Sequence, residues 1–257
     1  LAKALQANGL NDEALKLLEQ LPATSPYRLA ALESRIDILI AIQKIPEAIN
    51  IATEAARIVP KSVATKLLFA RVQEAAGNIP QVISTYREMT EAPEFSRLPP
   101  RQQASYRLLL ASALDQVEDW SSAKAELEKL LIVDPNNAQA LNYLGYSLLE
   151  RGGDRDKATE MVRRAYALEP NSSAITDSLG WAYFLQGDAT SALPLLEKAA
   201  KDAGSDIAIN EHLGDAYWTL GRRRDARYAW RIASQTSEGE VAERLSRKID
   251  VGLPAAR

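Results

Sequence analysis

Small and apolar residues recur along the chain at a fixed interval. The segment "SLGWAYFLQGDATSALPLL" spans residues 178–196, and "HLGDAYWTLGRRRDARYAW" starts 34 residues later and spans residues 212–230. Both contain Leu-Gly-x-Ala-Tyr, a second glycine seven residues after the first, and an alanine five residues further on. The residues of an active site occur once in a sequence, whereas a pattern repeated at a fixed interval indicates a repeated structural unit.

The interval extends over most of the chain. Gly145, Gly180 and Gly214 each follow a leucine at spacings of 35 and 34, and Ala111 holds the equivalent place one interval earlier. A second set of small residues follows the same period: Ala14, Ala48, Ala123, Ala158, Ala192 and Ala226. Two helices approach most closely where side chains are small or absent. The pattern therefore predicts one pair of packed helices in each interval.

Glycines and prolines mark the expected helix ends. Five glycines are expected to end first helices in the left-handed conformation: Gly9, Gly77, Gly153, Gly187 and Gly221. Four prolines are expected to close units after the second helix: Pro26, Pro60, Pro135 and Pro170. Asn and Ser in the segments "PNN" and "PNSS" are expected to cap the helix that follows.

These residues resemble the tetratricopeptide repeat, whose 34-residue pattern is Trp-x2-Leu-Gly-x2-Tyr, then Ala-x3-Phe, then Pro. The likeness covers nearly all of the chain and is closest in "LNYLGYSL…ATEMV…P", "TDSLGWAY…ALPLL" and "NEHLGDAY…ARYAW". The chain departs from the pattern by lacking Trp at the first marker and by having Gly204 where one proline belongs. The resemblance implies an all-α, right-handed α-solenoid of about seven helix-turn-helix units.

The period predicts a single array over residues 1–257. Its units are expected near 1–28, 29–62, 63–96, 104–137, 138–172, 173–206 and 207–236, with an insertion at 90–103 and a capping helix at 238–251. In the last segment Val241, Leu245 and Ile249 lie four residues apart among charged residues, which suits a helix that closes the end of an array.

Two features interrupt the regular array. Leu1 falls on position 7 of a unit, so we expect the first unit to be truncated and the chain to be a segment of a longer array. The insertion "TEAPEFSRLPPRQQ" is either a tolerated surface insertion or a seam at which the superhelix changes its curvature.

The composition argues against catalysis, metal or cofactor binding, and nucleic-acid binding. The net charge is −3, cysteine is absent, and no run of about 20 apolar residues could span a bilayer. His212 is the only histidine, has no accompanying Ser-Asp pattern, and is expected to be structural or solvated. We therefore expect no catalytic residue, no metal site and no cofactor. The basic clusters 163–164 and 222–224 do not follow a groove, so nucleic acid is not an expected partner.

The resemblance implies that first helices line a concave surface that binds a peptide or protein segment. The candidate binding residues at inward positions are Asn142, Tyr146, Asp177, Trp181, Phe184, Glu211, Asp215 and Trp218. Large aromatic side chains dominate binding energy at interfaces, although such residues can also pack against a neighbouring repeat. Inward acids would repel the C-terminal carboxylate that one subclass of these repeats clamps. A partner segment that is apolar and carries Lys or Arg is expected instead.

The predicted function is a non-catalytic interaction scaffold. The segment "LGYSLLERGGD…LGWAYFLQGD…HLGDAYW" is weakly similar to tetratricopeptide adaptors and lipoproteins of the bacterial cell envelope, which implies an adaptor in an envelope assembly or proteolysis complex. The same resemblance favours a periplasmic or membrane-anchored location over the cytoplasm. Whether a targeting segment has been removed ahead of Leu1 is left open by the sequence. The alternative is a self-associating structural module whose aromatic residues are buried between subunits.

Overall fold

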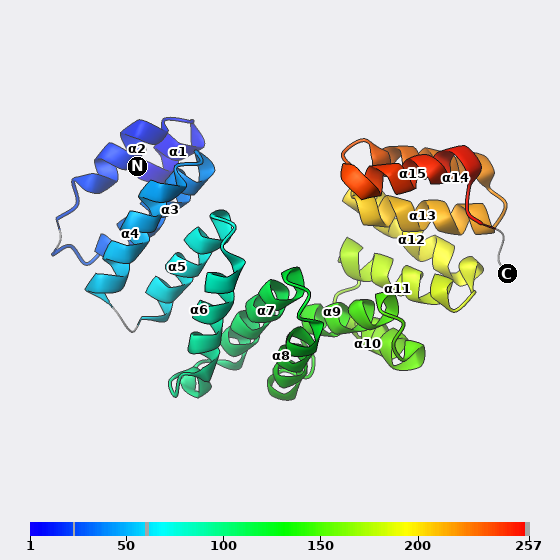
Figure 1. Ribbon diagram of the computed structural model, residues 1–257, viewed down its shortest axis with the longest axis horizontal. Coiled ribbons are helices and arrows are strands. Elements are labelled where there is room, and N and C mark those ends of the chain that lie inside the picture. The colour runs from blue at the N-terminus through cyan, green and yellow to red at the C-terminus, as the bar shows by residue number, and fades with distance from the viewer. Residues whose placement is uncertain (23, 60–61, 255–257) are drawn as a thin grey trace. The chain divides into compact units, whose positions relative to one another are not determined.

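The computed structural model describes residues 1–22, 24–59 and 62–254, and these residues form α-helices joined by short turns, with no β-strand among them (Figure 1). The expected all-α solenoid is confirmed: in the described part of the chain seven helix pairs are followed by one further helix. Pro60 lies outside the described residues. The chain divides into two compact units, unit 1 (Leu1–Val133) and unit 2 (Asp134–Arg257).

Each unit contains several helix pairs. Unit 1 contains α1 (Ala2–Ala7), α2 (Asn11–Glu19), α3 (Arg28–Ala41), α4 (Ile45–Ile58), α5 (Val63–Ala75), α6 (Ile79–Glu91), the 3-10 helix η1 (Phe95–Arg97), α7 (Pro100–Gln116) and α8 (Trp120–Val133). Unit 2 contains α9 (Ala138–Glu150), α10 (Arg155–Leu168), α11 (Ser173–Leu185), α12 (Ala189–Ala203), α13 (Ile207–Thr219), α14 (Arg223–Ser234) and α15 (Gly239–Val251). The single array expected from the sequence stays a prediction.

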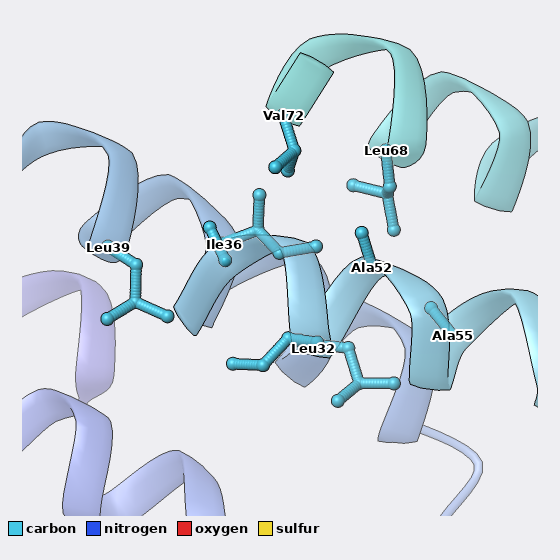
Figure 2. Close-up of a cluster of buried hydrophobic side chains, with 9 residues drawn as sticks. Leu32, Ile36, Leu39, Ala52, Ala55, Leu68 and Val72 are labelled. Atoms are coloured by element: carbon cyan, nitrogen blue, oxygen red, sulfur yellow. The ribbon is translucent and has the colours of Figure 1, made fainter. Parts of the chain in front are cut away.

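The core of unit 1 continues from one helix pair to the next. Figure 2 shows side chains of α3, α4 and α5 pointing into one shared space, among them Ile36, Ala52 and Val72, which are fully buried. The first helix of one pair therefore completes the core of the pair before it. This sharing explains why the pattern must be repeated, since one pair cannot bury its apolar face alone.

The insertion is anchored to unit 1 by an aromatic residue. Phe95 of η1 is buried, and its ring lies 6.4 Å from that of Tyr106 on α7. The guanidinium carbon of Arg107 lies 5.0 Å from the centroid of the Phe95 ring. The segment between α6 and α7 is thus tied to the helix that follows it.

The recurring small residues lie where paired helices meet. Each of the six periodic alanines, from Ala14 to Ala226, has 0% of its surface exposed. A Cβ atom built on Gly214 would lie 2.3 Å from Cδ1 of Trp230, and one built on Gly145 would lie 2.7 Å from Cγ2 of Val162. The glycines of α9 and α13 are therefore explained by the close approach of α10 and α14.

The turn after α9 differs from the expected one. Gly152 has the left-handed φ of +69°, whereas Gly153 does not, so the expectation for Gly153 was wrong. Gly152 lies seven residues after Gly145, the spacing that also separates Gly180 from the left-handed Gly187. The doublet therefore adds its extra residue after the glycine that ends the helix.

Helix α15 packs against the last helix pair. Leu245 is fully buried in a cluster with Ala226, Trp230 and Ala233 of α14, and Val241 and Ile249 pack at its edge. Within the described residues, no helix combines the length and apolar character needed to cross a membrane.

Candidate functional site

Three first helices of unit 2 bring aromatic side chains together. α11 contacts both α9 and α13, so side chains from three successive pairs share one face. The ring of Trp181 on α11 lies 3.9 Å from that of His212 on α13, with an interplanar angle of 11°. Tyr146 on α9 lies 6.3 Å from the same imidazole in a tilted arrangement. We call Tyr146, Trp181 and Phe184 the aromatic surface; all three are half-buried.

The indole of Trp181 is held by all three helices. Its ring stacks on Phe184, one turn further along α11, with centroids 4.9 Å apart and an interplanar angle of 12°. Its Nε1 donates a hydrogen bond of 2.7 Å to Oε1 of Glu150 at the end of α9. Two stacked rings and one hydrogen bond fix the orientation of this side chain, so little rotamer entropy remains to be lost on binding.

His212 and Asp177 form a buried pair beneath the aromatic surface. His212 Nδ1 donates to the carboxylate of Asp177, at 2.9 Å from Oδ2 and 3.1 Å from Oδ1, and both side chains are buried. Asp177, expected to face a ligand, therefore lies inside the fold with its charge engaged. The histidine is part of the support for Trp181.

Two further candidate acids bind the terminal helix. Arg244 of α15 donates two hydrogen bonds of 2.8 Å to Glu211, and Lys248 donates to Glu211 at 2.7 Å and to both carboxylate oxygens of Asp215 at 2.7 and 2.8 Å. Both acids are buried. Because α15 already supplies these cations, neither acid is open to a basic ligand.

The pKa values of Glu211 and Asp215 are shifted in opposite directions by this environment. Burial alone would raise the pKa of Glu211, but the hydrogen bonds from Arg244 and Lys248 outweigh it and lower that pKa to about 2. For Asp215 burial prevails over Lys248 and the Trp230 indole N–H, which donates at 2.9 Å, and the pKa is raised.

The remaining candidates have separate surroundings. Trp218 contacts Trp230 at 5.4 Å and lies beneath the guanidinium of Arg223 at 3.8 Å, so it belongs to the packing of α13 against α14 and α15. Asn142 is half-buried on α9, and its Oδ1 has no hydrogen-bond partner among the described residues. Burial, together with the negative charges of Glu150, Asp177 and Glu211, raises the pKa of the Tyr146 phenol.

Sequence reasoning did not identify Arg244 and Lys248 as parts of this region, and it placed Glu150 at an inward position without counting it among the candidate binding residues. A signal for the two cations was present: Glu211 and Asp215 are four residues apart on one helix, as are Arg244 and Lys248 on another. Two pairs of opposite charge with the same spacing favour contact between the faces that carry them.

Comparison with known proteins shows that part of the chain matches a known repeat family. A family model described as tetratricopeptide repeat matches residues 108–152 and 148–207. A tetratricopeptide repeat-containing protein of Pseudomonas aeruginosa is 34% identical over 97 residues, which is 38% of this chain and 16% of that protein.

Solved structures show the same fold. A tetratricopeptide repeat protein from Parabacteroides merdae superposes with a TM-score of 0.69 at 18% identity, covering 95% of this chain and 94% of that one. YrrB, described as a tetratricopeptide protein with an unusual peptide-binding site, gives a TM-score of 0.52 at 16% identity over 76% of this chain and 97% of its own. Such proteins are in general non-catalytic, and the fold supports a role as a protein–protein interaction scaffold. Residues 108–207 therefore match the tetratricopeptide repeat family model, and the chain as a whole is similar in repeat motif and fold to tetratricopeptide repeat proteins.

Proposed function

We propose that unit 2 binds an extended segment of a partner protein on the aromatic surface formed by Tyr146, Trp181 and Phe184. The observation that carries this proposal is the orientation of Trp181, which is fixed by His212, Phe184 and Glu150 while its side chain stays half-exposed. Rigid, partly exposed aromatic rings bind with little entropic cost and are typical anchors of interfaces. A peptide-binding site on the structural neighbour YrrB supports the same kind of ligand.

The charges around this surface favour an apolar segment that carries Lys or Arg. Glu150 is exposed at its edge, and only Oε1 is engaged by the Trp181 indole. Glu211 and Asp215 are neutralised by α15, so Glu150 is the acid that such a ligand would meet. A carboxylate ligand would meet this negative edge and is disfavoured.

The setting we propose is an adaptor in an envelope assembly or proteolysis complex, in line with the sequence resemblance. Fractionation of cells that carry the full-length protein tests this setting. Recovery in the cytoplasmic fraction alone would exclude it and leave peptide binding to be judged separately.

The binding proposal is tested with two labelled peptides of equal length. One alternates leucine with lysine, and the other has glutamate at every lysine position. Fluorescence anisotropy should show that the Leu/Lys peptide binds the wild-type chain and that this binding, unlike any binding of the Leu/Glu peptide, depends on the aromatic surface. Trp181→Ala should weaken Leu/Lys binding by about tenfold or more, as expected for an aromatic anchor.

Two controls complete the experiment. Tyr27→Ala removes a tyrosine of unit 1 that is 70% exposed and should leave Leu/Lys binding unchanged. Circular dichroism shows whether Trp181→Ala keeps its helices, and Phe184→Ala offers a second, milder truncation of the same surface. Unchanged Leu/Lys binding in a folded Trp181→Ala chain would refute the proposal. Sedimentation as a dimer that Trp181→Ala dissociates would instead establish self-association through these residues.

A further inference from the structure

The outer face of α14 carries an exposed tyrosine between two arginines. Arg224, Tyr228 and Arg231 are spaced by four and three residues, which places their side chains along one face of the helix. Tyr228 is 67% exposed, and both arginines are exposed. Among the residues that the structure describes, neither guanidinium has an acidic partner. We call these three residues the outer patch.

The neighbouring arginines of the same segment are already engaged. Arg222 pairs with Glu197 at 3.2 Å and with Asp225 at 2.6 Å. Arg223 donates to the Trp218 carbonyl and covers its ring, and Arg227 donates to the Ile249 carbonyl at 2.8 Å. The outer patch therefore holds the cations of α14 that the fold does not use.

An apolar cavity adjoins this patch. Tyr228 is part of the wall of a cavity of about 410 Å³ between α12, α13 and α14. Leu213, Ala229 and Ile232 supply apolar wall, and Lys201 adds a further exposed cation without an acidic partner in the described part of the chain. The two acids of the cavity wall, Glu197 and Asp225, are those that Arg222 already neutralises. The cavity is large enough for one bulky apolar side chain.

We propose that the outer patch and this cavity form a second docking surface, which binds an acidic protein segment with a large apolar side chain between its acids. The apolar side chain enters the cavity beside Tyr228, and the carboxylates pair with Arg224 and Arg231. Tyrosine and arginine are among the residues enriched at interface anchors, and guanidinium groups frequently bind carboxylates through two parallel hydrogen bonds. The surface lies on the outer side of a second helix, so it is separate from the aromatic surface on α9 and α11.

A protein segment fits this surface better than nucleic acid does. Binding to phosphates requires cations along the length of a groove. Here the unpaired cations gather around one tyrosine and one apolar cavity, which suits a short segment that combines negative charge with an apolar anchor.

The same two peptides test the proposal, with their roles reversed. The Leu/Glu peptide should bind the wild-type chain, and the double reversal R224E/R231E should weaken that binding by about tenfold or more. Tyr228→Ala should weaken it in a chain with an unchanged melting temperature. The matched control K157E/R247E makes the same change of net charge at two exposed cations elsewhere in unit 2 and should bind Leu/Glu like the wild type.

The outcomes separate this proposal from the previous one. Trp181→Ala should lose Leu/Lys binding and keep Leu/Glu binding, whereas R224E/R231E should do the opposite, so either surface can fail alone. The outer patch is refuted if the wild-type chain does not bind Leu/Glu, or if the reversal and its control bind it equally. Tighter binding of a single-stranded oligonucleotide of the same charge would also overturn it, because the patch would then recognise phosphate.

Discussion

The imidazole of His212 lies parallel to the indole of Trp181, with ring centroids 3.9 Å apart, while its Nδ1 donates to the buried carboxylate of Asp177. The only histidine of the chain thus connects a buried charge to the side chain that presents the aromatic surface. An isolated histidine in a repeat array is here a structural support, placed by α13 against α11.

Removal of this support should destabilise unit 2. His212→Ala leaves Asp177 buried without its hydrogen-bond donor, and we expect a loss of about 3 kcal/mol in the free energy of unfolding. In an Asp177→Asn background the same substitution should cost less, with a coupling of about 1 kcal/mol between the two sites. Urea unfolding followed by circular dichroism measures both. His212→Phe is the control that keeps an aromatic ring beside Trp181 but removes the nitrogen donor. If His212→Ala lowers the free energy of unfolding equally in the wild-type and Asp177→Asn chains, His212 and Asp177 are not coupled.

Glu150 should contribute charge to binding rather than stability. Glu150→Gln keeps an oxygen that can accept from Trp181 Nε1, so the melting temperature should change little. The loss of one negative charge at the edge of the aromatic surface should weaken the affinity for the Leu/Lys peptide by about a few-fold. This is the change in affinity expected when one partly exposed ion pair is removed. Glu169→Gln, at an exposed position after α10, is the matched control. Identical affinities for both variants would exclude a role for the Glu150 charge.

The glycine of α13 should be more favourable than alanine, against the usual helix propensity. In an exposed helix Gly→Ala stabilises by about 1 kcal/mol. At Gly214 the added methyl group would overlap Trp230, and we expect Gly214→Ala to destabilise by about 1–3 kcal/mol. Thermal unfolding measures Gly214→Ala in the wild-type chain and in a Trp230→Phe chain. The smaller phenyl ring should relieve the overlap, so Gly214→Ala should destabilise the Trp230→Phe chain less. A stabilised single variant would mean that helix propensity prevails over the overlap.

Acid should weaken the attachment of α15 through Glu211. Its pKa is held at about 2 in the folded chain, below the ordinary 4.5, so the unfolded chain binds the proton more readily. The stability that Glu211 contributes is therefore complete above 4.5 and is lost as the pH falls towards about 2. Asp215, whose pKa is raised, acts in the opposite direction and partly offsets this loss.

The measurement for this prediction is the melting temperature as a function of pH. Glu211→Gln should lower it at neutral pH and make its decline in acid shallower. Glu243→Gln removes an exposed glutamate from α15 and should shift neither feature. A decline of unchanged steepness in Glu211→Gln would assign the acid sensitivity to other carboxylates.

The fold could be predicted from the sequence because it depends on local, repeated features. The periodic alanines and glycines specify where two helices meet, and each of these positions depends on a neighbour at a nearly constant distance along the chain. The doublet Gly152-Gly153 shows the limit: an extra residue is evident in the sequence, but only the geometry of the turn decides which glycine has positive φ.

The candidate site was predicted less completely because inward positions of a helix are not all alike. The period places Asp177, Glu211 and Asp215 on first helices, but it cannot say what covers them. Their partners are His212 on the next pair and two cations of α15, a helix that lies outside the repeat pattern. Trp181 and Phe184 stay half-exposed although the Trp181 ring stacks on both Phe184 and His212.

The attachment of Trp181 to three helices has a mechanical consequence. Its indole reaches Glu150 on one pair and His212 on another, so a rotation or sliding of any of these pairs must disturb the same side chain. A ligand that grips the indole therefore resists relative motion of three repeats at once. Binding of a short segment at Trp181 would therefore reduce the relative motion of these three repeats and stiffen this part of unit 2.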